Sequence, residues 1–429
     1  MSDIAATPGE QSPMTIDING WKSDAMQRRV ARRYASERRF RFLGFFAVAL
    51  SGGFLAFLLG TMLFQGVGGF TQTEIRLAVD FPSAAAGVTP AQLSGKGADD
   101  AMAAIDLESL VITSATATLG EEGPSLLSDG AWLSLRSALQ DDPSLLTRKA
   151  EVWVPASVDI DQAAKGADEP EADRQLAALK AQDRVQTSLS MTFLTASDST
   201  DPTVVGIWGA FKGTLLTMAI TAILAFPIGM LSAVYLEEYA PRNRWTDLIE
   251  VSINNLAAVP SIIFGLLGLA VFLNFFNMPR SAPIVGGLTL ALMTMPVIVI
   301  ASRNAIKAVP PSIRDAALAM GASRVQVVFH HVLPLAMPGV LTGAIIGMAR
   351  ALGETAPLIM IGMRAFISSP PTSFTEPATV LPVQIFLWSD EVSRGFVEKT
   401  SAAIIVLLAF LMTMNATAIY LRNHFERRW

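Results

Sequence analysis

Six long apolar stretches dominate the pattern of hydrophobic and polar positions along the chain. A helix of about 20 apolar residues crosses the roughly 30 Å hydrocarbon core of a bilayer. Five stretches of at least that length contain no charged residue: Phe42–Phe64, Gly213–Leu236, Val251–Met278, Ser281–Ser302 and Thr400–Leu421. A sixth stretch, from about Ala336 to Met363, is interrupted only by Arg350 and Glu354. The pattern therefore predicts six membrane-spanning helices.

The composition agrees with this interpretation. Apolar residues make up 51% of the 429 positions, charged residues make up 16%, and the mean hydropathy is +0.44, which is typical of a membrane protein. The chain has no cysteine, so disulfides and thiolate metal sites are excluded. Its three histidines are too few and too scattered for a metal centre. We expect neither a metal nor another cofactor.

The distribution of Lys and Arg predicts the orientation of the spans. With a cytoplasmic N-terminus, the inside segments hold 17 Lys and Arg and the two short outside loops hold four. Cytoplasmic segments carry the excess of positive charge, so both termini are expected in the cytoplasm. Residues 1–41 then form a basic cytoplasmic tail and 42–64 a retained anchor helix. Anionic lipid of the bilayer explains the arginines of this tail better than nucleic acid does.

Residues 71–203 form an outward-facing insert of different character. This segment has 21 Asp and Glu against nine Lys and Arg. Glu151–Pro155 and Val185–Phe193 are predicted as strands, and Glu171–Arg184 as an amphipathic helix. We expect a small α+β domain. It carries no catalytic motif, and its acidity argues against capture of a free anion, so a docking or spacer role is the simpler interpretation.

A distinctive motif lies between the fourth and the interrupted stretch. Residues 315–334 read DAALAMGASRVQVVFHHVLP. We expect a short helix over Asp315–Met320 with the acidic residue in its first turn, a left-handed end at Gly321, and a second helical segment that Pro334 stops. The motif resembles the coupling loop of binding-protein-dependent ABC importer permeases. The matching positions are Asp315, Ala316, Ala317, Gly321, Leu333 and Pro334. The resemblance implies a docking site for an ATPase within a cytoplasmic loop, 303–336.

The chain lacks a motor of its own. It contains no Gly-x4-Gly-Lys-Ser/Thr loop, the motif that cradles nucleotide phosphates. We therefore expect a transport subunit that is not itself an enzyme, with ATP hydrolysis carried out by a separate subunit.

Arg350 and Glu354 are the informative charges within the apolar stretches. A charge at bilayer depth costs on the order of 3 kcal/mol, and such residues face a bundle interior or a pathway. Their spacing places both on one helix face, where they could also form a simple salt bridge. Pro357 cannot donate to the carbonyl of Gly353, which predicts a kink. Of the two interpretations, we favour the pathway, because Arg before Glu is the less favourable order for helix stability.

The run from Ala349 to Leu358, ARALGETAPL, narrows the resemblance. It is similar to the corresponding helix of phosphate-importer permeases of the PstA type, as are Asn255–Gly265 and Ala308–Arg314. The resemblance covers 204–429, the expected permease core. It implies that Arg350, Glu354 and Thr355 lie on a phosphate path in a bacterial inner membrane. The implied partners are a second permease, an ATPase dimer and a periplasmic phosphate-binding protein.

The expected fold is thus an all-α polytopic membrane protein of six transmembrane helices with a small α+β extracytoplasmic insert. Other functions remain open at this point. The nearest is an importer of another oxyanion, such as phosphonate, molybdate or sulfate. A secondary transporter or channel would need internal inverted repeats or several broken helices, which we do not find. A sensor on a membrane anchor would not need five further spans.

Overall fold

The computed structural model describes residues 24–85, 87–95 and 97–425. Residues 1–23 of the predicted basic tail (1–41) and the last residues, 426–429, lie outside this range. The chain divides into two compact units, Met1–Thr61 and Met62–Trp429. Helix α1, Asp24–Gly69, begins in the first unit and ends in the second.

The insert is built around a three-stranded antiparallel sheet with the order β2-β1-β3. Its strands are β1 (Thr71–Asp80), β2 (Lys149–Pro155) and β3 (Val185–Leu189). The α-helices of the insert are α2 (Pro90–Leu93), α3 (Ala98–Ala103), α4 (Leu107–Leu119), α5 (Ala131–Asp141), α6 (Val158–Ala164), α7 (Pro170–Ala181) and α8 (Met191–Thr195). Short 3-10 turns cover Phe81–Ala84, Gly123–Leu126 and Pro143–Thr147. The expected small α+β domain is confirmed.

The central strand β1 organises the core of the insert. Its alternate residues Ile75, Leu77 and Val79 are buried, the first two with no exposed surface. Ile75 is paired with Val154 on β2 and with Val185 on β3. Each such buried aliphatic side chain stabilises the fold by about 1.5–3 kcal/mol. The prediction did not include this strand.

The predicted elements of the insert are partly right. β2 covers the expected strand at Glu151–Pro155, and α7 covers most of the expected helix at Glu171–Arg184. The predicted strand Val185–Phe193 is wrong in its second half, because β3 ends at Leu189 and α8 follows. Ser190 causes this change, since its hydroxyl caps α8 by accepting the amide hydrogen of Phe193.

The remainder of the chain is helical. Its helices are α9 (Trp208–Val234), α10 (Arg244–Ala257), α11 (Ser261–Gly268), α12 (Pro283–Lys307), α13 (Pro311–Ala319), α14 (Arg324–Gln326), α15 (Leu333–Gly353), α16 (Ala356–Met360), α17 (Leu381–Ser389) and α18 (Gly395–Phe425). Widened π turns extend three of them, over Tyr235–Tyr239, Leu269–Phe275 and Val327–Val332.

Among the described residues, five helical segments are long and apolar enough to cross a membrane: Met26–Gly69, Trp208–Tyr239, Pro283–Lys307, Arg324–Gly353 and Gly395–His424. The predicted third span is not a straight helix. It divides into Arg244–Ala257 and Ser261–Phe275, which meet at 100°. Pro260 explains the break, because a proline disfavours helical geometry at the residue before it. If the bent pair counts as one span, the total is six, and the predicted all-α polytopic fold is confirmed.

Helix α12 packs against both α9 and α15. It is the most buried of the five spans, because 61% of its most apolar 18-residue segment lies inside the protein. Lipid is as apolar as the side chains, so helices in a membrane associate through close packing of small residues. Gly343 and Gly347 of α15 face Ala301 and Thr294 of α12 in this way. A β-carbon at Gly347 would lie only 2.9 Å from Thr294 Cγ2.

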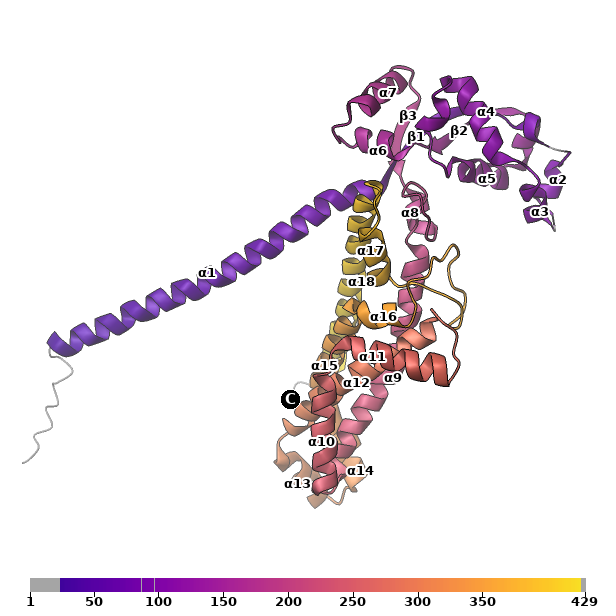
Figure 1. Cartoon of the computed structure of the whole chain (residues 1–429). Coiled ribbons are helices and arrows are strands. Elements are labelled where there is room, and N and C mark those ends of the chain that lie inside the picture. The colour runs from indigo at the N-terminus through magenta and orange to yellow at the C-terminus, as the bar shows by residue number, and fades with distance from the viewer. Residues whose placement is uncertain (1–23, 86, 96, 426–429) are drawn as a thin grey trace, which may run out of the picture. The chain divides into compact units, whose positions relative to one another are not determined.

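Buried polar contacts join the insert to the helical part. Lys165 Nζ lies 2.6 Å from Asp161 Oδ2 and 2.9 Å from Glu398 Oε2, on the first turn of α18. Lys399 Nζ donates to the carbonyl oxygen of Gly69 at 2.9 Å and lies over the ring of Phe193. The insert and the α13–α14 hairpin (residues 311–326) lie at opposite ends of α9 (Figure 1).

The packing of α15 on α12 yields a stability prediction. Gly343→Ala places a methyl group against Ala301 Cβ, which cannot rotate away, and overpacking of this kind costs about 1–3 kcal/mol. Gly353→Ala, on the same helix, meets nothing within 4 Å and gains up to about 1 kcal/mol of helix propensity. Thermal unfolding in detergent should therefore rank Gly343→Ala below wild type and Gly353→Ala at or above it. Equal midpoints for the two variants would contradict this packing account.

Candidate functional site: a broken span and a helical hairpin

The last apolar stretch before α17 is broken next to its two charges. Helix α15 ends at Gly353, Glu354 takes an extended backbone conformation, and α16 begins at Ala356. Pro357, in the first turn of α16, has no amide hydrogen for the carbonyl of Gly353. The predicted kink is therefore a complete break, and its polar backbone lies at the level of Glu354 and Thr355.

The structure brings Arg350 and Glu354 together at this break. Arg350 Nε lies 3.4 Å from Glu354 Oε1, and the side chains are 47% and 20% exposed. Within the described residues, Nη1 and Nη2 of Arg350 make no hydrogen bond. The hydroxyl of the nearby Thr355 does not cap α16. The pair is thus a long, exposed contact that leaves most of the guanidinium available to another group.

Helix α11 packs directly against α16, the helix that follows the break. Gly265 of α11 lies so close to α16 that a β-carbon there would be 2.7 Å from the Cα of Pro357. No side chain of residue 265 therefore separates the two backbones at this point.

The coupling-loop motif forms a helical hairpin. Gly321 has φ +87°, the left-handed conformation expected at the end of the first helix. Ala317 is buried, whereas Asp315 and Ala316 are exposed. Four large apolar side chains of the hairpin region are exposed as well: Leu318, Met320, Val325 and Phe329.

Two details of the predicted hairpin are wrong. Helix α13 begins at Pro311, so Asp315 lies outside its first turn. The reason is that Pro311 has a fixed φ suited to the first helical position. Pro334 does not stop the second segment either, because the helix runs on from Arg324 to Gly353. The widened turn at Val327–Val332 precedes Pro334 and makes room for its ring. Leu333 is buried at the start of α15.

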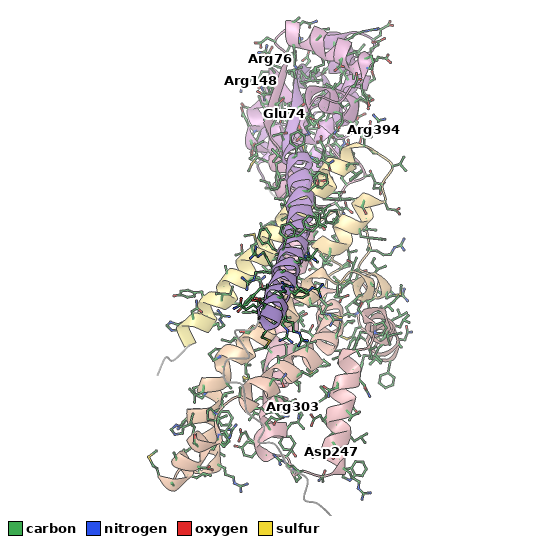
Figure 2. All side chains as sticks on the ribbon, turned by 90° about the vertical axis from the view of Figure 1, so that its left-hand side faces the viewer. Glu74, Arg76, Arg148, Asp247, Arg303 and Arg394 are labelled. Carbon is green, nitrogen blue, oxygen red and sulfur yellow. The ribbon has the colours of Figure 1, made fainter. Side chains whose placement is uncertain are left out.

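A charged cluster beside the hairpin was not singled out in the sequence. Glu237 and Glu238, at the end of α9, contact cations of α12 and α13. Glu250 of α10 joins the same group through Arg303 of α12. The available signal was a Glu-Glu pair after one apolar stretch and Arg303 and Lys307, four residues apart, after another. Figure 2 places Arg303 at the same end of the molecule as Asp247 of α10.

The described residues contain no group of three or more His, Cys, Asp or Glu side chains that could hold a metal ion.

The helical region matches the family described as "binding-protein-dependent transport system inner membrane component" over residues 225–429. A Mycobacterium tuberculosis protein, phosphate transport system permease protein PstA 1, is 32% identical over 225 residues. That alignment covers 52% of this chain and 72% of the relative. The chain belongs to the PstA-type permeases of binding-protein-dependent ABC importers. This PstA-type permease is accordingly a multi-pass inner-membrane transport subunit.

The chain has three further similarities to known proteins. The probable ABC transporter permease protein YqgI of Bacillus subtilis is 35% identical over 189 residues, which cover 44% of this chain and 63% of that protein, just under two thirds of its length. Residues 27–174 match a family described as a domain of unknown function, DUF3333. A structure of the MetNI methionine ABC transporter aligns with a TM-score of 0.42 and 19% identity, covering 52% of this chain and 98% of that one.

Proposed function

We propose that this chain is the permease subunit of an ATP-driven importer of inorganic phosphate. The observation that carries the proposal is the 32% identity with a permease named for phosphate transport over 72% of its length. The chemistry of the broken span supports it. Arginine offers planar, bidentate donors that fit phosphate oxygens, and the terminal nitrogens of Arg350 have no hydrogen bond within the described residues.

In this proposal, Arg350, Glu354 and Thr355 line the phosphate path. A mutual salt bridge is the competing explanation for the two charges. Exposed pairs contribute little, about 0–1 kcal/mol, and this one is 3.4 Å long and uses only Nε of Arg350. Two neutral residues would avoid the free-energy cost of placing charges in a membrane. A role in contacting substrate therefore accounts better for the presence of both Arg350 and Glu354.

The α13–α14 hairpin is the proposed docking site for an ATPase dimer. Its exposed Leu318 and Met320 and its exposed acidic Asp315 offer a partner both an apolar contact and a charge. A second permease subunit and a periplasmic phosphate-binding protein complete the proposed complex. Binding and hydrolysis of ATP then drive the exchange between inward- and outward-facing states.

The proposed orientation places the hairpin and both termini in the cytoplasm and residues 71–203 in the periplasm. Two independent features support it. The Lys and Arg counts favour the hairpin side as cytoplasmic. The hairpin and the insert lie at opposite ends of α9 (Figure 1), as a cytoplasmic loop and a periplasmic domain require.

The path role of Arg350 predicts a loss of transport. In a strain that lacks the native permease, Arg350→Gln should lower the initial rate of radiolabelled phosphate uptake by about tenfold or more, because hydrogen bonds to charged groups contribute about 1.5–3 kcal/mol. Arg350→Lys keeps the charge but not the planar fork and should retain part of the rate. Arg148→Gln, an exposed position on the insert, is the matched control. Uptake by Arg350→Gln at the wild-type rate would exclude this role.

Glu354 yields a separate prediction about selectivity. Its carboxylate can accept a hydrogen bond from a protonated phosphate and repels a fully ionised tetrahedral anion such as sulfate. Glu354→Gln should therefore make phosphate uptake more sensitive to competing sulfate, measured as inhibition across a sulfate series. Unchanged uptake together with unchanged discrimination would remove Glu354 from the path.

The docking role of the hairpin predicts loss of the ATPase. Deletion of 316–321 should abolish co-purification of the ATPase while the permease still reaches the membrane. Met320→Glu, at a side chain that is 79% exposed, should weaken the association without shortening the chain. Val392→Glu, at a side chain that is 98% exposed between α17 and α18, is the matched control and should bind normally. An ATPase that associates with the deletion variant as with wild type would rule out docking at this hairpin.

A further inference from the structure

Two neighbouring carboxylates at the end of α9 reach in different directions. Glu237 and Glu238 lie in the widened turn Tyr235–Tyr239, and each side chain is only 12% exposed. Adjacent residues on a helix point roughly 100° apart. Glu237 therefore contacts α12, and Glu238 contacts α13.

Arg314 fixes α13 through Glu238. Its Nε and Nη2 donate to Glu238 Oε1 at 3.1 and 2.8 Å. Its Nη1 donates to the carbonyl oxygen of Val309 at 2.7 Å, and Nη2 also donates to that of Ile306 at 3.0 Å. These carbonyls belong to the end of α12 and the turn after it, and that of Ile306 also accepts the amide hydrogen of Val309 at 3.2 Å. The guanidinium thus joins α9, α12 and the first helix of the hairpin, and α13 cannot shift alone without breaking these bonds.

Arg303 connects α10 to the end of α9 through Glu250 and Glu237. Arg303 of α12 is 10% exposed, and it contacts Glu237 Oε1 at 2.5 Å and Glu250 Oε2 of α10 at 2.7 Å. Lys307 adds a longer contact of 3.4 Å to Glu237. Helix α10 contributes no fully buried residue within the described part of the chain. Ile253 of α10 packs against the core, and Glu250, which is 40% exposed, adds the ion pair with Arg303.

The cluster is electrically balanced, with three carboxylates and three cations. Stability alone explains such a group poorly, because replacing buried ion pairs by apolar residues is often neutral or stabilising. What directional charge pairs do provide is one defined arrangement of the helices that they join. Here they join the hairpin to α10, and α10 leads through the 100° bend into α11. Gly265 of α11 in turn lies against Pro357, beside the broken span.

We propose that Glu237 and Glu238 are positioning residues that pass a displacement of the α13–α14 hairpin to α10 and α11, and so to the break that carries Glu354. The proposal rests on the docking of an ATPase at the hairpin. A cluster that only held the fold together would affect assembly and stability, but not the amount of phosphate moved for each ATP hydrolysed.

The test is a measurement of that ratio. The purified complex of this chain with its ATPase and second permease is reconstituted in liposomes, and phosphate uptake and ATP hydrolysis are measured on the same sample. Glu238→Gln keeps the shape and an acceptor oxygen but removes the charge. It should leave assembly and ATP hydrolysis in place and lower the phosphate transported per ATP at least about fivefold, the lower end of typical coupling between sites.

Two further variants make the result specific. Arg314→Gln should lower the ratio similarly, and the double variant should cost little more than either single one, since all three act on one contact. Asp247→Asn is the matched control, because Asp247 is exposed on α10 outside the cluster and should leave the ratio unchanged. If Glu238→Gln fails to assemble, Glu250→Gln replaces it, because this side chain is 40% exposed and its loss removes the ion pair of α10 with Arg303. Its ratio should also fall.

The outcomes separate the two proposals. A wild-type complex that couples hydrolysis to phosphate uptake, with an unchanged ratio in Glu238→Gln or its replacement, overturns the positioning role alone. A wild-type complex that does not bind the ATPase, or hydrolyses ATP without moving phosphate, overturns the proposed function instead. A lowered ratio with additive effects in the double variant would also overturn the role, because Glu238 and Arg314 would then act separately.

Discussion

The close contact of α12 with its neighbours is the constraint on which the rest of the structure depends. In a bilayer, burial of apolar side chains does not hold helices together, so contact has to come from shape. Gly343 and Gly347 allow α15 to lie directly against α12. With these helices fixed, the cations near the end of α12 meet the carboxylates of α9 and α10. Both the hairpin and the break after Gly353 are positioned by this one packed surface.

Sequence reasoning located the features that follow from local chemistry. Apolar length predicted the spans, because a membrane imposes it directly. Gly321 was expected to end a helix in the left-handed conformation, and its φ of +87° agrees. Pro357 predicted a disruption beside Glu354, because its missing amide leaves a carbonyl without a partner wherever the helix lies. Each of these inferences needed only the residue and its immediate neighbours.

The predictions failed where the local structure depends on contacts with distant parts of the chain. Strand β1 was missed although Ile75, Leu77 and Val79 alternate, because its role as the central strand depends on pairing with β2 and β3, which are far away in sequence. The bend at Pro260 was hidden within an uninterrupted apolar stretch that satisfied the length criterion. The contacts of Glu237 and Glu238 could not be assigned, because both partners come from helices that only the fold brings together.

The two charged groups differ in geometry, and the difference matches the roles proposed for them. The pair at the break is exposed, long and leaves guanidinium nitrogens open, which suits a group that exchanges partners as an anion passes. In the cluster beside the hairpin, Glu237, Glu238 and Arg303 are each at most 12% exposed. Most contacts there lie between 2.5 and 3.1 Å and the charges balance, which suits a joint that keeps its arrangement. An import cycle needs both a group of contacts that stays fixed and a group that can change partners. A fixed connection between helices has an effect only if the residues at its far end can change their contacts. Gly265 of α11 lies against Pro357, so the helix that follows α10 lies directly beside the break that carries Glu354.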